Sequence, residues 1–214
     1  MTIAILGGTG KEGAGLALRW AKLGHTILIG SRDAGRARAK AEELREAADA
    51  RPITGHTNAE AAAGAEVVVI ALPANGLAAT LPEVRPACRN KVVVSTVVPL
   101  TFGGPRLFTP PPIGSSGEEV ASLLPEARVV SAFHHIAAHE LADADHPIDC
   151  DLLICGQDPP AKETVTELGR AMGLRVLDVG PLANSGPLEG ITAVLATINR
   201  RYKLKNSGIT ITGM

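Results

Sequence analysis

LGGTGKEGAG, residues 6–15, is the stretch that decides the fold. A short apolar run leads into it, and a helical pattern follows it directly. Its glycines Gly8, Gly10 and Gly13 match the spacing G-x-G-x-x-G. In that spacing one glycine allows a tight turn, the second lets the backbone approach a diphosphate, and the third lets the helix pack closely on the strand. The stretch predicts a dinucleotide site at a helix N-terminus, although the glycines could also serve only to make the turn.

The pattern around this stretch is typical of an α/β protein. Apolar runs alternate with helical patterns, and two later runs are apolar throughout, as expected for strands covered by helices on both faces. We predict strands over Thr2–Leu6, Thr26–Ile29, Glu66–Leu72 and Lys91–Thr96, and helices over Gly13–Leu23 and Ala34–Ala48. The expected fold class is α/β, with a Rossmann-type, doubly wound and mainly parallel sheet.

The second half of the chain is less regular. Glycine and proline interrupt Thr101–Ser116, which we predict to be a loop, either a mobile cover over a ligand or surface disorder. Further strands are predicted over Arg128–Phe133, Asp151–Cys155, Leu174–Val179 and Asn206–Thr212, and helices over Glu118–Leu124, Lys162–Met172 and Ser185–Lys203.

The last of these helices predicts a packing face. Its apolar stripe would lie on the sheet or on a second subunit, and consists of Leu188, Ile191, Val194, Leu195 and Ile198. We expect residues 1–133 to form a nucleotide-binding Rossmann domain. Residues 134–214 would form a smaller C-terminal region that completes the substrate cleft, ends in the long helix and contributes a possible dimer contact.

Composition excludes several classes of protein. The 214 residues carry 21 lysines and arginines against 22 acidic residues, so no bulk positive field exists to hold a nucleic acid or an anionic membrane. No apolar run is long enough to span a membrane, and the first residues lack the basic segment of a secretory signal. The three cysteines form no C-x-x-C pair, which predicts reduced thiols. We expect a cytoplasmic protein without nucleic-acid or membrane partners.

The end of the second strand indicates which nucleotide binds. A protein that prefers NAD normally has an acidic residue there, whereas Ser31 and Arg32 occupy this tip. A hydroxyl and a guanidinium can donate charge-assisted hydrogen bonds to a 2′-phosphate, and Arg36 lies one helical turn further on. Asp33 is the alternative acid for NAD, but its position is that of a helix N-cap. The sequence favours NADP(H).

The remaining cofactor contacts are expected from the glycine loop and from two strand ends. The ends of the fourth and fifth strands are apolar, which suits a nicotinamide ring that alternates between a cationic and a neutral form. Ordinary packing at strand ends is the alternative. The predicted contacts are Gly8, Thr9, Gly10, Lys11, Glu12 and Gly13 in the loop, and Ala71, Leu72, Pro73, Val97, Val98 and Pro99 at the strand ends.

Groups for acid–base catalysis are scarce. The only tyrosine, Tyr202, belongs to no Y-x-x-x-K motif, so a short-chain dehydrogenase is excluded. Three histidines lie together in AFHHIAAHE: His134, His135 and His139. His135 and His139 have the spacing of metal ligands on a helix, but no further ligand is evident, so we expect no metal site. The histidines could instead line a ligand cleft or lie at the surface.

At this point the chain resembles the NADPH-dependent oxidoreductases of coenzyme F420, a 5-deazaflavin. The resemblance runs nearly end to end. It is carried by LGGTGKEGAGLALRWAKLGH (6–25), IGSRDAGRARAKA (29–41), VVVSTVVP (92–99), VVSAFHHIAA (129–138) and DVGPLANS (178–185). It implies that Thr9, Ser31, Arg32 and Arg36 hold the 2′-phosphate, and that Pro99 and the preceding valines border the nicotinamide.

The resemblance also implies a second ligand. The deazaflavin side of a narrow apolar cleft would consist of His134, His135, Ile136, Ala137 and Asn184. NADP(H) and F420 would stack there and exchange hydride directly, so that no catalytic side chain is required. Two alternatives stay open: an NADPH-dependent flavin or imine-type reductase, and an NADP-binding redox sensor without turnover. A homodimer is expected through the last helix.

Overall fold

The computed structural model describes residues 1–49, 51–104 and 106–213, and it contains one eight-stranded sheet. The strands lie in the order β3-β2-β1-β4-β5-β6-β7-β8. The first six of that order are parallel, β7 is antiparallel to β6, and β8 is parallel to β7. Their bounds are β1 Thr2–Leu6, β2 Thr26–Ser31, β3 Ile53–Thr57, β4 Val67–Ile70, β5 Val92–Ser95, β6 Arg128–Ser131, β7 Asp151–Gly156 and β8 Arg175–Asp178. The predicted α/β class with a mainly parallel, Rossmann-type sheet is confirmed.

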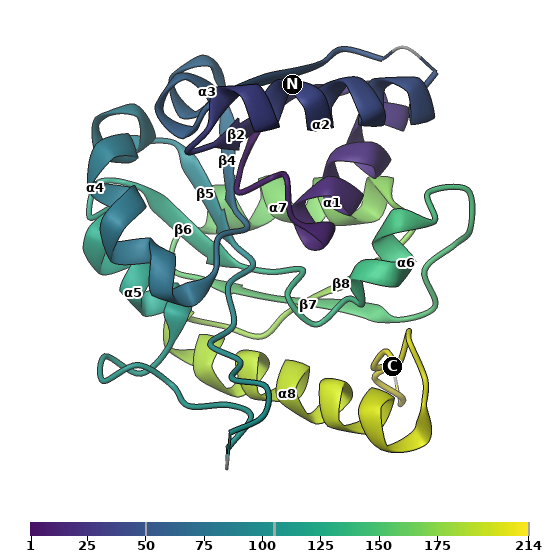
Figure 1. The fold of residues 1–214 in the computed structure, drawn as a ribbon. Coiled ribbons are helices and arrows are strands. Elements are labelled where there is room, and N and C mark those ends of the chain that lie inside the picture. Colours follow the sequence, from purple (N-terminus) through teal and green to yellow (C-terminus); the bar gives the residue numbers. More distant parts are fainter. Residues whose placement is uncertain (50, 105, 214) are drawn as a thin grey trace.

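Helices cover both faces of the sheet (Figure 1). One buried cluster joins α1, α2 and α7 to the strands, and a second joins α3, α4 and α5 to the other face. Helix α8 packs beside α5 over β7 and β8. The helices are α1 Lys11–Lys22, α2 Ala34–Ala47, α3 Asn58–Gly64, α4 Leu77–Cys88, α5 Ser116–Leu123, α6 Ala138–Ala142, α7 Pro159–Ala171 and α8 Ser185–Tyr202, with the 3-10 turns Ala74–Gly76 and Leu182–Asn184.

The central strands are buried because their side chains are apolar apart from Thr2 and Ser95 at the strand ends. Every residue of β4 and of β5 is buried, as is all of β1 after Thr2. Continuous apolar runs of this kind bury both pleat faces at once, which is why the sheet requires two helical layers. The chain order reverses between β1 and β4, and ligands of open α/β sheets bind at the carboxyl edge beside such a switch.

Short polar side chains set where several helices begin. The Asp33 carboxylate accepts hydrogen bonds from the amides of Gly35 and Arg36, so its predicted role as the N-cap of α2 is confirmed. Thr57 and Glu60 form a reciprocal capping box at the start of α3. Asp158 caps α7 by accepting from the Ala161 amide. These caps satisfy amides that have no partner within a helix, and each turns the chain sharply after a strand or loop.

Three features differ from the sequence-based expectation. Asn206–Thr212 is not a strand: it runs past the start of β7, where the Asp151 amide donates to the Ile209 carbonyl and the Asp151 carboxylate accepts from the Ile211 amide. Val194 does not share the buried stripe of α8, because 58% of it is exposed. Three helices, α3, α4 and α6, and the strand β3 were not predicted.

The predicted loop Thr101–Ser116 ends one residue early, since Ser116 begins α5. Residue 105 lies outside the described residues. The rest of the segment contains no helix or strand, only an isolated bridge between Leu100 and Phe108. Figure 1 shows the loop reaching from β5 to the side of α8. Its residues Thr101–Gly104 and Leu107 border a cavity of about 350 Å³ against the helix.

Candidate active site

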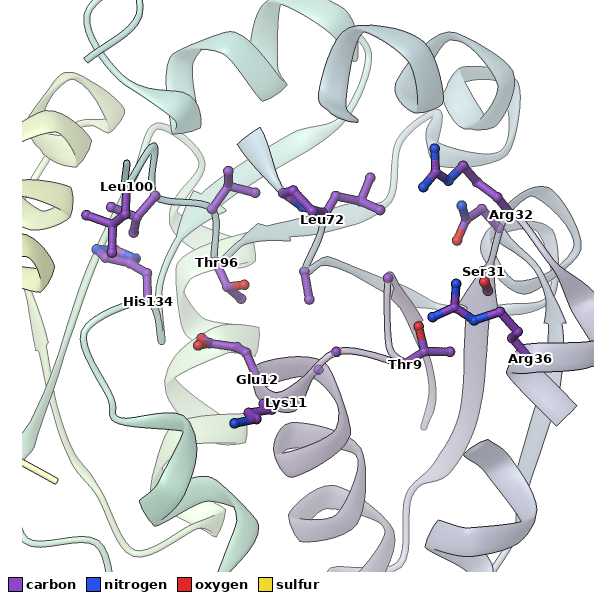
Figure 2. A pocket seen from close by; sticks show the side chains of 18 of the residues that line it. Thr9, Lys11, Glu12, Ser31, Arg32, Arg36, Leu72, Thr96, Leu100 and His134 are labelled. Carbon is purple, nitrogen blue, oxygen red and sulfur yellow. The ribbon is translucent and has the colours of Figure 1, made fainter. Parts of the chain in front are cut away.

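A cavity of about 680 Å³ lies at the carboxyl edge of the sheet, where β1, β2, β4, β5 and β6 end. Figure 2 shows side chains from all five strand ends around it. The residues that line it are Gly7, Thr9–Gly13, Ser31–Asp33, Arg36, Asn58, Ala71–Pro73, Thr96–Val98, Leu100, His134 and Thr192. All the predicted cofactor contacts except Gly8 and Pro99 are among them.

The glycine loop connects β1 to α1 with three different steric requirements. Gly7 has a φ of 77°, and a Cβ there would lie 2.6 Å from the Ala71 carbonyl oxygen. A Cβ on Gly8 would lie 2.8 Å from the Ile5 carbonyl oxygen, and one on Gly13 would lie 2.8 Å from the Gly8 Cα. A Cβ on Gly10, by contrast, would meet only the Gly7 carbonyl oxygen, at 3.5 Å. The fold itself therefore does not require glycine at position 10.

Polar and basic side chains gather at one end of the cavity. Ser31 ends β2 and is buried, while Arg32 and Arg36 are exposed and extend beside it over the cavity (Figure 2). The Ser31 hydroxyl accepts from the Asp33 amide at 3.2 Å, which orients the turn into α2. Because the Asp33 carboxylate accepts two amides of α2, it is held at the helix N-terminus. The arrangement offers donors to an anion rather than a carboxylate to a ribose.

The other end is mostly apolar. Ala71, Leu72 and Pro73 follow β4, and Val97 and Val98 follow β5; these are residues that the sequence predicts to border the nicotinamide. Thr96 and Leu100 also line this end and were not predicted. The Thr96 hydroxyl donates to the Ile70 carbonyl at 3.2 Å, which ties the end of β5 to the end of β4. Pro99 lies next to the lining residues without reaching the cavity.

His134 is a buried polar side chain at this end. It follows Phe133, which is fully buried and has a left-handed φ of 66°, an uncommon conformation for an aromatic residue. Phe133 packs edge-on against Trp20 with ring centroids 5.4 Å apart, and this packing holds the turn. The two ring nitrogens of His134 are buried and have no hydrogen-bond partner among the described residues. Burial lowers the pKa of His134 to about 3, so its ring is neutral.

The rest of the predicted deazaflavin side lies outside this cavity. His135 is buried, and its Nε2 lies 3.2 Å from the Leu153 amide and 3.1 Å from the Asp151 carbonyl oxygen, so it binds β7. Ile136 is buried in the core behind the sheet edge. The Asn184 side chain donates to the Val179 carbonyl at 2.6 Å and closes the turn after β8. His135 and His139 do not share a helix, because α6 begins at Ala138.

A second cavity, of about 860 Å³, adjoins the first at the glycine loop. Thr9, Gly10 and Lys11 line both cavities. From there the second cavity continues along Ala137–His139 and along the end of α8 to Asn199 and Lys205. Ala137, predicted for the deazaflavin side, lies in this second cavity. The two cavities together therefore extend from Arg32 past α1 to the C-terminal segment.

Arg19 anchors this region, and sequence reasoning did not identify it. It is 6% exposed and lies on α1. Its guanidinium donates to the backbone carbonyl oxygens of Glu140, Leu141, Asp143 and His146 at 2.6 to 3.2 Å. The chain that leaves the sheet at His134 is thereby fixed against the helix that begins at the glycine loop.

Other kinds of site find little support in residues 1–49, 51–104 and 106–213. Over these ranges no three His, Cys, Asp or Glu side chains cluster as metal ligands would. No helix in the same part of the chain is both long and apolar enough to cross a membrane.

Known proteins are similar to the chain along its whole length. An F420-dependent NADP reductase of Methanocaldococcus jannaschii is 40% identical over 222 residues, which cover 100% of this chain and 99% of that protein. The chain belongs to the F420-dependent NADP reductases. A second protein of that name, from Methanothermobacter marburgensis, is 39% identical with the same coverage. The family model described as NADP oxidoreductase, coenzyme F420-dependent, matches residues 2–99, and the predicted resemblance is confirmed.

A solved structure extends the similarity to three dimensions. A protein from Arthrobacter sp. FB24, provisionally named an F420-dependent NADP reductase, superposes with a TM-score of 0.86 at 27% identity over 99% of each chain. The match to the family model ends after β5, so it spans the glycine loop, the Ser31–Arg32 tip and the apolar strand ends. His134, Thr192 and the C-terminal part of the second cavity, from Ala137 to Lys205, lie beyond this match, in the part that the full-length relatives cover.

Proposed function

We propose that this protein transfers hydride directly and reversibly between NADP(H) and the deazaflavin coenzyme F420. One observation carries the proposal: a single cavity joins the basic pair Arg32 and Arg36 to an apolar end closed by His134. NADP(H) fits a cavity that is basic at one end and apolar at the other, because it carries an anionic phosphate at one end and a nicotinamide ring at the other. Its 2′-phosphate would lie at Ser31, Arg32 and Arg36, and its nicotinamide at the ends of β4 and β5.

The diphosphate would lie on the first amides of α1. An α-helix leaves its first amides without intrahelical acceptors, and its dipole favours negative charge at that end. Gly10 is the N-cap of α1 and offers no side-chain cap, so the position stays open to a phosphate oxygen. Thr9 would add a hydroxyl donor beside it.

The residues at the nicotinamide end support hydride transfer without acid–base catalysis. His134 is neutral and buried, Glu12 carries the only other titratable side chain among the lining residues that is directed toward this end (Figure 2), and the remaining side chains here are aliphatic or hydroxyl groups. F420 supplies a ring carbon that accepts or returns hydride, NADP(H) supplies the other, and the proton that the reduced deazaflavin also takes up comes from the solvent. The protein contributes alignment of the two rings and exclusion of water, which are sufficient for a transfer between two bound cofactors.

We propose that the acceptor enters through the second cavity. That cavity continues from the glycine loop along Ala137–His139 and carries Lys11 and Lys205, which suit the anionic tail of F420. Residues 1–133 would then hold the nucleotide, and residues 134–214, of which 214 lies outside the described residues, would complete the acceptor side. His135, Ile136 and Asn184 would act there through the backbone they hold in place.

The test is the loss of the visible absorbance of oxidised F420 on mixing with NADPH and the purified protein without oxygen. FMN, FAD and a cyclic imine serve as alternative acceptors. Rapid loss with F420 alone is the expected result. Turnover with a flavin or the imine instead would assign the protein to that class of reductase, and NADPH binding without turnover on any acceptor would leave a redox sensor.

A homodimer and a cytoplasmic location belong to the same proposal. Val194 on α8 and Tyr202 at its end are 58% and 66% exposed, which would suit a subunit contact along this helix. Light scattering after size exclusion measures the mass in solution. A Val194→Glu variant that stays folded as a monomer would support the contact, whereas an unchanged dimer would place it elsewhere.

A further inference from the structure

Glu12 occupies an unusual place for a glutamate. It lies in the first turn of α1 and lines the nucleotide cavity. Its Oε1 atom is buried and has no hydrogen-bond partner among the described residues, although the residue as a whole is partly exposed to the cavity. Figure 2 shows the carboxyl directed toward Thr96 and His134, the proposed nicotinamide end, and away from Arg32 and Arg36. Burying a carboxyl oxygen without a hydrogen-bond partner costs free energy. A ligand group that contacts this oxygen therefore changes the relative stability of the protonated and ionised carboxyl.

The groups around Glu12 do not neutralise it. His134 faces the same end of the cavity and is uncharged, because burial lowers its pKa to about 3. Lys11 is exposed, and its side chain extends away from the Glu12 carboxyl (Figure 2). Arg32, Asp33 and Arg36 face the cavity from its opposite end. Strand ends β4 and β5 contribute no charge. Burial accordingly raises the pKa of Glu12 well above its ordinary value.

The ligand proposed for this cavity exists in two charge states at the ring. NADPH carries a neutral dihydronicotinamide, and NADP⁺ carries a cationic ring. A neutral carboxyl is compatible with the first, whereas a carboxylate is stabilised by the second at short range in a site from which water is excluded. We propose that Glu12 distinguishes the two nucleotides: its carboxyl is protonated beside NADPH and ionised beside NADP⁺. The inference rests on the proposed nucleotide site, not on the identity of the acceptor.

The charges balance through the reaction. When NADPH is oxidised, the ring loses a hydride to the acceptor and becomes cationic, and Glu12 loses a proton to water and becomes anionic. The net charge around the ring is unchanged. In the reverse direction the carboxyl regains the proton as the ring regains hydride. Glu12 is therefore a specificity-determining residue that links the redox state of the bound nucleotide to pH.

The proposed change in the pKa of Glu12 couples NADP⁺ binding to proton release. If NADP⁺ lowers the pKa of Glu12, then NADP⁺ binding releases a proton at any pH between the value in that complex and the value in the free protein. Over that window the affinity for NADP⁺ rises about tenfold per pH unit as pH rises. NADPH binding releases no proton from Glu12, so its affinity does not follow this slope.

Titration calorimetry of the wild-type protein with each nucleotide, in two buffers of different ionisation enthalpy, counts the protons released. A phosphate monoester also titrates, with a second pKa of about 6, but the 2′-phosphate is common to both nucleotides and cancels in their difference. The expected difference is up to one proton more for NADP⁺. In Glu12→Gln, which keeps the size of the side chain, the difference should vanish. Glu83→Gln, an exposed glutamate on α4, is the matched control and should keep it.

Equal proton counts for the two nucleotides in the wild-type protein overturn the inference, and so does a difference that persists in Glu12→Gln. The wild-type comparison stands even if the variant does not fold. Failure of both nucleotides to bind would instead remove the proposed cofactor site. Normal linkage without oxidation of NADPH by F420 would leave the inference intact and reject only the proposed acceptor.

Discussion

The Thr192 hydroxyl donates a 3.1 Å hydrogen bond to the backbone carbonyl of His134. These residues are 58 positions apart, one on α8 and the other after β6, and both line the nucleotide cavity. Because Phe133 holds a left-handed conformation just before His134, the turn requires support from its surroundings. The hydrogen bond places α8 in contact with the proposed nicotinamide end and fixes the distance across it.

Replacing Thr192 with valine should therefore impair hydride transfer more than nucleotide binding. The carbonyl of His134 loses a donor at a cost of about 1 kcal/mol, and the ring can move away from its partner. Stopped-flow single turnover measures the transfer step, and fluorescence titration measures the affinity. Thr192→Ser keeps the hydroxyl donor and should transfer hydride at close to the wild-type rate. Thr197→Val removes a hydroxyl from the same helix that bonds only to the Ala193 carbonyl, and it should leave the rate unchanged. Equal effects of the two valines would contradict the role of Thr192.

Two glycine substitutions should separate binding from folding. Gly10→Ala places a methyl group 3.5 Å from the nearest protein atom, so the fold should tolerate it, but the methyl occupies the path of the diphosphate. Gly13→Ala places a methyl 2.8 Å from the Gly8 Cα and should destabilise the protein by about 1 to 3 kcal/mol. Urea unfolding and NADPH titration test both. A stable Gly10→Ala protein with undiminished NADPH binding would remove the diphosphate from this loop.

Local chemistry explains which parts could be predicted. The glycine loop, the Ser31–Arg32 tip and the Asp33 cap depend on neighbours within a few positions, so spacing alone identified them. The short strand β3 reads ITGHT, with polar residues at most positions, and α4 contains Pro82 and Pro86, which normally interrupt a helix. Both elements form because tertiary packing outweighs these weak local signals.

Long-range contacts explain what could not be predicted. Arg19 resembles a surface arginine on a helix, and only the backbone carbonyls more than 120 positions later give it a role. The NSGITIT segment alternates as a strand does, but Asp151 meets it through one amide and its carboxylate, so a ladder does not form. Asn184 lies in a motif of the family, yet its side chain bonds locally to the Val179 carbonyl. Sequence spacing contains no information on such partners.

Removal of the Arg32 guanidinium should discriminate between nucleotides. Arg32→Ala should weaken NADPH by roughly 1 to 3 kcal/mol and NADH much less, because only NADPH carries the 2′-phosphate. Arg36→Ala should show the same preference. Arg38→Ala is the control, since Arg38 lies on the same helix α2 without lining the cavity. Competition titrations with both nucleotides give the ratio. Equal losses for NADPH and NADH would contradict the assignment of this end of the cavity.

The buried His135 should make the fold sensitive to mild acid. Burial lowers its pKa from 6.5 to about 4, and its Nε2 lies 3.2 Å from the Leu153 amide that donates to it. Between these values the unfolded chain binds a proton at His135 that the folded chain does not bind, so the free energy of unfolding is full above pH 6.5 and falls as pH drops toward 4.

The loss of unfolding free energy attributable to His135 is about 3 kcal/mol at most. His134, whose pKa burial lowers to about 3, acts in the same direction, whereas Glu12 and Glu189, whose pKa values are raised by burial, act in the opposite direction, so the wild-type curve alone does not isolate His135. His135→Gln keeps an acceptor for Leu153 but cannot titrate, and the free energy of unfolding of the wild type relative to this variant should fall by that amount between pH 6.5 and 4. Parallel curves would mean that the pKa of His135 is not lowered in the folded protein, and its contact with β7 would then have to be a donor to the Asp151 carbonyl instead.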